Sequence, residues 1–169
     1  MNDLVNKAQT FAAAAHAAVG QKRKYTNEPY IVHPMEVASI VASVDGNEEM
    51  VAAAWLHDVV EDTSIDIWTI GVMFTDTVAS YVNYLTDSSK PEDGNRAIRK
   101  AIDCKHIAKA PKEVKTIKLA DLISNTSSIV EYDPKFAKIY LEEKKLLLKV
   151  LTEGDKTLYK RAYKLAYGE

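Results

Sequence analysis

The segment Met50-Val51-Ala52-Ala53-Ala54-Trp55-Leu56-His57-Asp58-Val59-Val60-Glu61-Asp62 decides how the rest of the chain is interpreted. Its first seven residues are apolar almost all round, a pattern typical of a buried helix. The carboxylates that follow are costly to bury unless they are paired or coordinate a metal. They also lie at the expected C-terminal end of that helix, where the helix dipole disfavours negative charge. Asp58 and Asp62 are four residues apart, so two like charges share one face. A bound cation would resolve all three conflicts.

The composition is that of an ordinary globular domain. The chain has 169 residues, 47% hydrophobic and 27% charged, and a formal net charge of −2. This charge argues against a general nucleic-acid binder, which would carry a basic excess. Cys104 is the single cysteine, so an internal disulfide is excluded and a reducing compartment fits. The sequence shows no apolar run long enough to span a membrane and no signal peptide. We therefore expect a cytoplasmic protein with neither a nucleic acid nor a membrane as its partner.

Helical periodicity runs through almost the whole chain, whereas strand-like alternation is scarce. The pattern predicts an all-α fold and a single domain over residues 1–169. Asn and Gly mark a turn near residue 46, Ser64 can cap a helix that ends at Met73, and Thr75 can cap the next. The predicted helices cover residues 3–19, 34–44, 48–60, 64–73, 75–85, 96–108, 111–130, 134–151 and 155–167.

Two further residues are candidate metal ligands beside His57 and Asp58. His33 directly precedes Pro34, which holds it extended at the mouth of a helix. Asp121 falls on an apolar helix face, where a lone carboxylate needs compensation. The alternatives are a surface or capping role for the histidine and a hydrogen bond to a neighbouring helix for the aspartate. Together the four residues form a mixed nitrogen and oxygen set, which suits Mn, Fe, Co or Zn better than calcium. Four protein ligands leave room for water and substrate.

Three blocks of sequence resemble the signature blocks of the ppGpp hydrolases, a branch of the HD-domain metal-dependent phosphohydrolases. These are the hydrolase half of the stringent-response enzymes and the small stand-alone alarmone hydrolases. The blocks run from Gln21 to Pro34, from Trp55 to Thr63 and from Val114 to Asn125. The resemblance implies an HD-domain helical bundle that uses Mn²⁺, or another divalent transition metal, to hydrolyse guanosine 3′,5′-bis(diphosphate) (ppGpp) to GDP and pyrophosphate.

The resemblance also implies a role for individual residues. The metal ligands would be His33, His57, Asp58 and Asp121. The residues that activate or position the attacking water would be Glu61 and Asp62, which follow His57 and Asp58 by four residues each and so share one helix face. Their alternatives are a solvated acid and a cap of the next helix. The substrate contacts would be Arg23, Lys24, Asn125 and Ser128.

The chain departs from the family pattern at positions that bear on the substrate. Leu122 stands where a basic residue is common, Ser127 stands where an Arg is frequent, and residues 25–27 replace a glycine-containing turn. The metal site is thus better supported than phosphate and base recognition. A small anionic nucleotide is the expected partner. A phosphohydrolase for another nucleotide or phosphorylated metabolite, a non-catalytic nucleotide-sensing module, and a homo-oligomer are the open alternatives.

Overall fold

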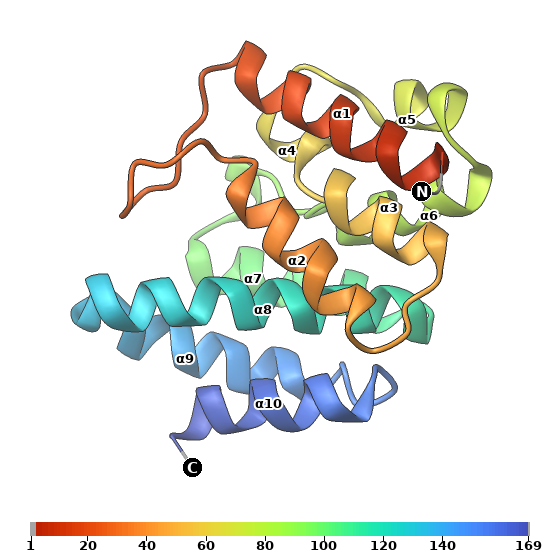
Figure 1. The fold of residues 1–169 in the computed structure, drawn as a ribbon. Helices are drawn as coiled ribbons and strands as arrows, with labels where there is room; N and C mark the ends of the chain where they lie inside the picture. Colours follow the sequence, from red (N-terminus) through yellow and green to blue (C-terminus); the bar gives the residue numbers. More distant parts are fainter. Residues whose placement is uncertain (1–2, 169) are drawn as a thin grey trace. The chain divides into compact units, whose positions relative to one another are not determined.

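Helices form the regular structure of residues 3–168, the part of the chain that the computed structural model describes (Figure 1). Within these residues no strand is found, and Lys22 and Pro29 form an isolated antiparallel bridge. The all-α prediction is therefore confirmed. No helix in this range has both the length and the apolar character needed to cross a bilayer.

The chain divides into two compact units, Met1–Thr86 and Asp87–Glu169. The first contains α1 (Asp3–Ala18), α2 (Val32–Ala42), α3 (Glu48–Leu56), α4 (Val59–Asp62), α5 (Ile67–Met73) and α6 (Asp76–Leu85). The second contains the 3₁₀ helix η1 (Pro91–Asp93), α7 (Arg96–Ala108), α8 (Lys112–Tyr132), α9 (Pro134–Leu148) and α10 (Lys156–Tyr167). The single domain over residues 1–169 stays a prediction.

In the first unit the alanine-rich α3 is the central helix, in contact with α1, α2 and α6. Ala52, Ala53 and Ala54 are fully buried, and the small side chains let three neighbouring helices approach closely. Asn47 caps the helix by accepting a hydrogen bond from the Met50 amide. In the second unit α8, α9 and α10 pack pairwise, and α7 contacts α9.

The predicted helix through Val60 is wrong, because α3 ends at Leu56 and α4 begins at Val59. A side-chain hydrogen bond lies at the interruption. The His57 imidazole Nδ1 lies 2.7 Å from the Ala54 carbonyl oxygen in the last turn of α3. The imidazole is thus held against the end of the helix where the chain leaves it. Asp58 has φ −102° and ψ −2° and becomes the N-cap position of α4.

Two other predicted helix starts need correction. Asp66, not Ser64, caps α5, since its carboxylate accepts the Thr69 amide at 2.8 Å. His33 lies inside the first turn of α2 rather than extended before it. Pro34 is tolerated there because the first turn of a helix has no intrahelical acceptor for its amides. The predicted Thr75 cap and the helix over residues 96–108 are confirmed.

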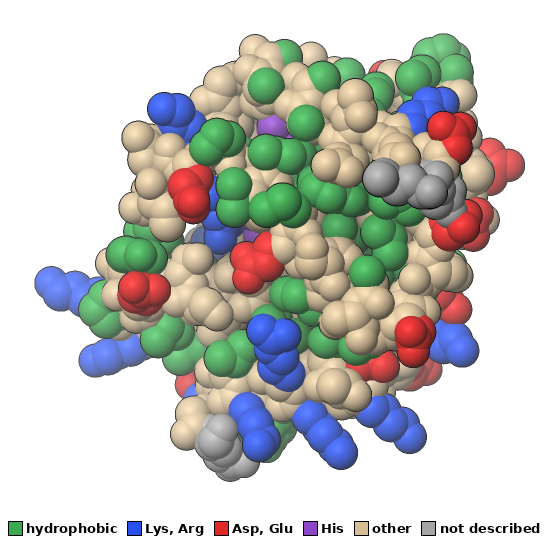
Figure 2. Space-filling model, in the orientation of Figure 1, with side chains coloured by type: hydrophobic (Ala, Val, Ile, Leu, Met, Phe, Trp, Pro, Cys, Tyr) green, Lys and Arg blue, Asp and Glu red, His purple; other side chains and the backbone are tan. Residues whose placement is uncertain are grey.

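The surface carries charged stretches and an exposed apolar patch. Figure 2 shows Lys and Arg side chains along the edge where Figure 1 places α10, whose exposed residues include Lys156, Lys160 and Lys164. Trp68 and Val72 of α5 are 72% and 63% exposed. The homo-oligomer that the sequence left open stays a prediction.

Gly154 allows the loop before α10 to lie directly on α8. A Cβ atom at this position would meet the Leu119 Cδ1 at 2.7 Å and the Lys115 carbonyl carbon at 3.1 Å. The same loop is held by the Asp155 amide, which donates to the Thr116 hydroxyl at 2.9 Å. The close approach of two backbones therefore requires glycine.

We expect Gly154→Ala to lower the free energy of unfolding by about 1–3 kcal/mol, because the α8 backbone must move to admit the methyl group. Urea denaturation followed by circular dichroism measures the change. Gly71→Ala is the matched control: it lies within α5, its added Cβ finds nothing closer than the Ala79 Cβ at 3.9 Å, and it should leave stability unchanged or raise it. Equal stability of the two variants would contradict the close packing at Gly154.

Candidate metal centre

Three potential ligands converge in the first unit. α2 supplies His33, and the turn between α3 and α4 supplies His57 and Asp58. The Asp58 Oδ2 lies 3.5 Å from the His33 Nε2 and 3.0 Å from the His57 Nε2. One ligand atom from each residue lies within 4.8 Å of the others. The two imidazoles are buried, whereas the carboxylate is partly open to solvent. The cluster therefore offers two nitrogens and an oxygen to one point.

The hydrogen bond at the end of α3 settles which His57 nitrogen can bind a cation. A carbonyl oxygen only accepts, so the Nδ1 that faces the Ala54 carbonyl carries the proton. The neutral imidazole then presents the Nε2 lone pair toward the Asp58 carboxylate. Two electron-rich atoms at 3.0 Å repel one another unless a cation or a proton lies between them. The donor set thus fits a divalent metal ion, with the backbone carbonyl orienting the ligand.

Tyr30 contacts the cluster, and sequence reasoning assigned it no role there. Its hydroxyl donates to the Asp58 Oδ2 at 2.6 Å, and its ring lies 5.7 Å from the His33 ring, centroid to centroid. The phenol therefore holds the carboxylate that faces both imidazoles. The one available signal was its place three residues before His33, within a block already singled out.

Glu61 and Asp62 are exposed on the short helix α4. The Asp62 Oδ2 accepts a hydrogen bond from the Gln21 Nε2 at 2.9 Å. Partial desolvation of the carboxylate raises the pKa of Asp62, the Gln21 hydrogen bond opposes this, and the nearby Asp58 carboxylate raises the pKa further. The predicted single helix face for both acids and both ligands is wrong, since the chain turns between His57 and α4. Asp62 does not cap α5, and the roles of the two acids stay predictions.

The basic loop that carries Arg23 and Lys24 is closed by backbone hydrogen bonds. The Arg23 amide donates to the Glu28 carbonyl at 2.8 Å, and its carbonyl accepts from the Asn27 amide at 3.0 Å. Asn27 has φ 59°, which asparagine tolerates better than most residues, and so the chain manages without glycine here. Lys24 is exposed, with its Nζ 4.9 Å from the centroid of the Tyr25 ring. Substrate contact by this loop stays a prediction.

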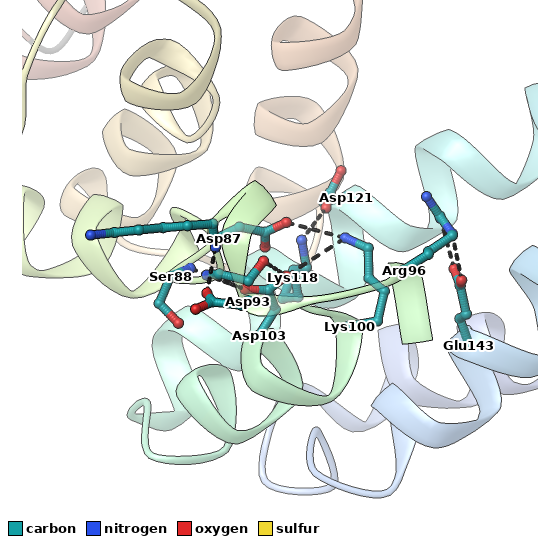
Figure 3. A network of polar contacts seen from close by, with 11 residues as sticks. Asp87, Ser88, Asp93, Arg96, Lys100, Asp103, Lys118, Asp121 and Glu143 are labelled. Atoms are coloured by element: carbon teal, nitrogen blue, oxygen red, sulfur yellow. Dashed lines mark hydrogen bonds and ion pairs between the residues drawn. The ribbon is translucent and has the colours of Figure 1, made fainter. Parts of the chain in front are cut away.

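The remaining site residues, Asp121, Asn125 and Ser128, belong to α8 in the second unit. Asp121 is 8% exposed and its carboxylate is held within its own helix. Lys118 donates to Oδ2 and Asn125 donates to Oδ1, each at 2.8 Å (Figure 3 shows the lysine). Two residues of its own helix thus compensate the carboxylate. Its part in a metal site stays a prediction.

Figure 3 shows this aspartate beside Lys118, in a network of acidic and basic side chains. The Lys100 Nζ lies 3.1 Å from Asp87 and 3.9 Å from Asp103. Lys144 forms no ion pair with a described residue, and its Nζ lies 4.6 Å from the centroid of the Tyr140 ring. Burial, reinforced by Lys118, lowers the pKa of Lys144 to about 8. The second unit therefore holds a desolvated lysine beside a network of paired cations and acids.

Comparison with known proteins identifies the family. The HD-domain sequence pattern matches residues 8–146 of this chain. The chain therefore belongs to the HD-domain family.

Named relatives and a solved structure are also similar. A Synechocystis protein named probable guanosine-3′,5′-bis(diphosphate) 3′-pyrophosphohydrolase is 36% identical over 135 residues, which cover 78% of this chain and 17% of the relative. A Brucella ovis GTP pyrophosphokinase is 30% identical over 129 residues, 75% of this chain and 17% of the relative. The chain thus spans about a sixth of these relatives. A solved structure of a metazoan ortholog of SpoT that hydrolyses ppGpp superposes on this chain with a TM-score of 0.87 and 24% identity. The superposition covers 99% of this chain and 96% of the other. This match confirms the HD-domain helical fold.

We expect Tyr30→Phe to weaken divalent metal binding about tenfold, because the Asp58 carboxylate loses the donor that orients it. Isothermal titration with Mn²⁺ measures the affinity. Tyr159→Phe, which removes the hydroxyl of a half-buried tyrosine on α10, should bind the ion like the unmodified protein. An unchanged affinity in Tyr30→Phe would show that the phenol does not support the ligand.

We expect Lys144→Met to stabilise the fold by about 1 kcal/mol at neutral pH, because it removes a partly buried, desolvated ammonium that forms no ion pair with a described residue. The folded pKa of about 8 lies below the ordinary 10.5, so unfolding takes up a proton between these values. The stability of the unmodified protein should therefore rise over this pH window, and the advantage of the variant should shrink. Urea denaturation between pH 7 and pH 10.5 measures both. Lys138→Met, at an exposed position of α9, should show neither effect.

Proposed function

We propose that this HD-domain protein is a metal-dependent hydrolase that removes pyrophosphate from the 3′ position of ppGpp and leaves GDP. The observation that carries the proposal is the cluster of His33, His57 and Asp58, three ligand atoms within 4.8 Å of one another. It lies in a chain whose relative from Synechocystis bears that activity in its name. Mixed nitrogen and oxygen donors favour Mn²⁺ or a related divalent transition metal.

Asp121 is proposed as the fourth ligand. Lys118 and Asn125 hold its two oxygens in fixed positions and favour the ionised carboxylate. Together, His33, His57, Asp58 and Asp121 would hold one ion and leave coordination positions open. When bound, such an ion supplies a Lewis acid that polarises a phosphoryl oxygen and lowers the pKa of a water molecule.

The acids of α4 are proposed to handle the proton of the attacking water. Asp62 is anchored by Gln21 and has a pKa above its ordinary value, which makes its carboxylate a better base than a fully solvated one. Glu61 is exposed one residue before it and is proposed to position the water. The water oxygen forms the new bond to phosphorus as the acid takes a proton from it. The bond to the ribose 3′ oxygen breaks, that oxygen takes up a proton to become the hydroxyl of GDP, and pyrophosphate is released.

Four residues are proposed as substrate contacts. Arg23 offers a fork suited to bidentate phosphate contact, and Lys24 adds a flexible point charge on the same exposed loop. Asn125 is proposed to contact the nucleoside and Ser128 to lie near the substrate. Both extend from the helix that carries Asp121.

A second candidate keeps the chemistry and changes the substrate to another nucleotide or phosphorylated metabolite. Two observations favour it. Leu122 is 2% exposed within the core, so its position cannot present the basic side chain that is common there in ppGpp hydrolases. The Ser127 hydroxyl donates to the Ile123 carbonyl at 3.4 Å and likewise supplies no positive charge.

Purified protein with Mn²⁺ and ppGpp tests the function. We expect equimolar GDP and pyrophosphate, separated by anion-exchange chromatography, and loss of turnover on chelation of the metal. Asp58→Ala and Asp121→Asn should abolish turnover, and Glu61→Gln should lower it by about 10²-fold or more. Glu48→Gln, at an exposed position of α3, is the control for the last change and should retain full activity.

The same assay separates the alternatives when dNTPs and NADPH replace ppGpp. Turnover of one of these, with ppGpp untouched, would support the second candidate. Metal and nucleotide binding without any turnover would support a sensing module and overturn the proposed enzyme. Turnover that survives in Asp121→Asn would remove this residue from the ligand set.

A further inference from the structure

We propose that His16 and Gln21 form a hydrogen-bonded chain that orients the Asp62 carboxylate, so that both are positioning residues. Their effect on catalysis rests on the proposed function of Asp62. Neither residue is among the ligands, acids or substrate contacts assigned above. The chain lies wholly within the first unit and joins α1 to α4 across 46 positions of sequence.

Two hydrogen bonds define the direction of the chain. The Gln21 Nε2 lies 2.9 Å from the Asp62 Oδ2, and the Gln21 Oε1 lies 2.8 Å from the His16 Nδ1. An ionised carboxylate only accepts, so the amide nitrogen must face Asp62. The amide oxygen must then face His16, and Nδ1 must carry the proton that it accepts. The acid at one end thus dictates the tautomer of the imidazole at the other.

The surroundings of His16 select the same tautomer. The residue is 1% exposed, and its Nε2 is buried and makes no hydrogen bond within residues 3–168. A proton on this nitrogen would be a buried donor without an acceptor, which is costly. The neutral form protonated at Nδ1 avoids that cost. The ring also packs on Tyr30, at 4.8 Å between centroids, whose hydroxyl holds Asp58. One buried histidine therefore supports both the metal ligand and the acid.

The backbone brings Gln21 to this place. Gly20 ends α1 with φ 63°, a left-handed conformation that glycine adopts without strain. The chain then turns back, so that the Gln21 amide donates to the His16 carbonyl at 3.1 Å and the Gln21 carbonyl accepts from the Tyr30 amide at 3.1 Å. Both backbone groups of Gln21 are thus fixed, and its side chain starts from a defined point.

The chain has a consequence for the chemistry of Asp62. This acid lies exposed on a helix of one turn, where its side chain has rotational freedom. The Gln21 bond occupies Oδ2 and holds one orientation, and no described contact involves Oδ1. A neutral donor does this without the charge of Lys or Arg, which would make the carboxylate a weaker base. The Gln21 bond lowers the pKa of Asp62, yet this pKa stays above its ordinary value, so the carboxylate is oriented and remains a usable base.

Nuclear magnetic resonance tests the chain without any substrate. In a long-range ¹H–¹⁵N correlation spectrum at neutral pH, we expect His16 to appear as the Nδ1-protonated tautomer. The His16→Asn spectrum assigns the signal among the four histidines. Gln21→Met keeps the length of the side chain and removes both hydrogen bonds, so the His16 pattern should shift toward an exchanging mixture. An Nε2-protonated His16, or a pattern unaffected by Gln21→Met, would overturn the proposal.

Kinetics test whether the chain acts through Asp62. We expect Gln21→Met to lower kcat about tenfold with KM and Mn²⁺ affinity within about twofold, because it disturbs the acid and spares the ligands. Gln9→Met makes the same change at an exposed position of α1 and should have no effect. In an Asp62→Asn background Gln21→Met should cost nothing further. His16→Asn, which keeps a short donor, should retain more kcat than His16→Leu.

The outcomes separate this inference from the proposed function. Absence of ppGpp hydrolysis in the unmodified protein would overturn the proposed function. The His16 tautomer would still show whether the hydrogen bonds from His16 through Gln21 to Asp62 exist. Hydrolysis with additive effects of Gln21→Met and Asp62→Asn would overturn the positioning role and leave the proposed function intact. A matched loss of kcat and of Mn²⁺ affinity would mean that Gln21 supports the fold rather than the acid.

Discussion

The hydrogen bond between the His57 imidazole and the Ala54 carbonyl is the interaction on which the site depends. It lies where α3 ends and the chain turns before it restarts as α4. The same bond fixes the proton on Nδ1 and directs the other nitrogen toward Asp58. One contact at the end of the helix therefore prepares the ligand. It is possible because the alanines of α3 let its last turn lie deep within the core, away from competing water.

Much of the helical arrangement could be predicted from sequence, because local periodicity and capping residues within a few positions indicate where helices lie. The limits of α7 and the Thr75 cap are examples. His57 and Asp58 could also be predicted as candidate ligands, since acidic residues directly after a buried apolar helix are unfavourable without compensation. The break after Leu56 was not visible, because neither Pro nor Gly marks it in the sequence. Tyr30 and Gln21 escaped for another reason: their partners lie 28 and 41 residues away, and such pairs leave no periodic trace.

The carboxylates of the site are stabilised in different ways. Asp121 lies on a long helix and is held by residues one turn away on that helix, an arrangement that local sequence alone can encode. Asp58 and Asp62 lie at a chain turn and on a single helical turn, where no such neighbours exist. They are held by side chains from the segment between α1 and α2. A carboxylate on a stable helix can be oriented from within, whereas one beside a break needs support from elsewhere in the chain.

This difference gives the segment from Gln21 to Tyr30 a second role: besides carrying basic residues, it holds the carboxylates of Asp58 and Asp62. It turns back on itself through the Gly20 and Asn27 conformations and is closed by backbone hydrogen bonds, so that its two ends lie beside one another. One end provides the amide that holds Asp62, and the other provides the phenol that holds Asp58. The cations at its tip are thus tied by a short, closed loop to the groups that orient the acids. A change in the tip that alters the closure would reach both carboxylates, so recognition of an anion and orientation of the acids share one structural element.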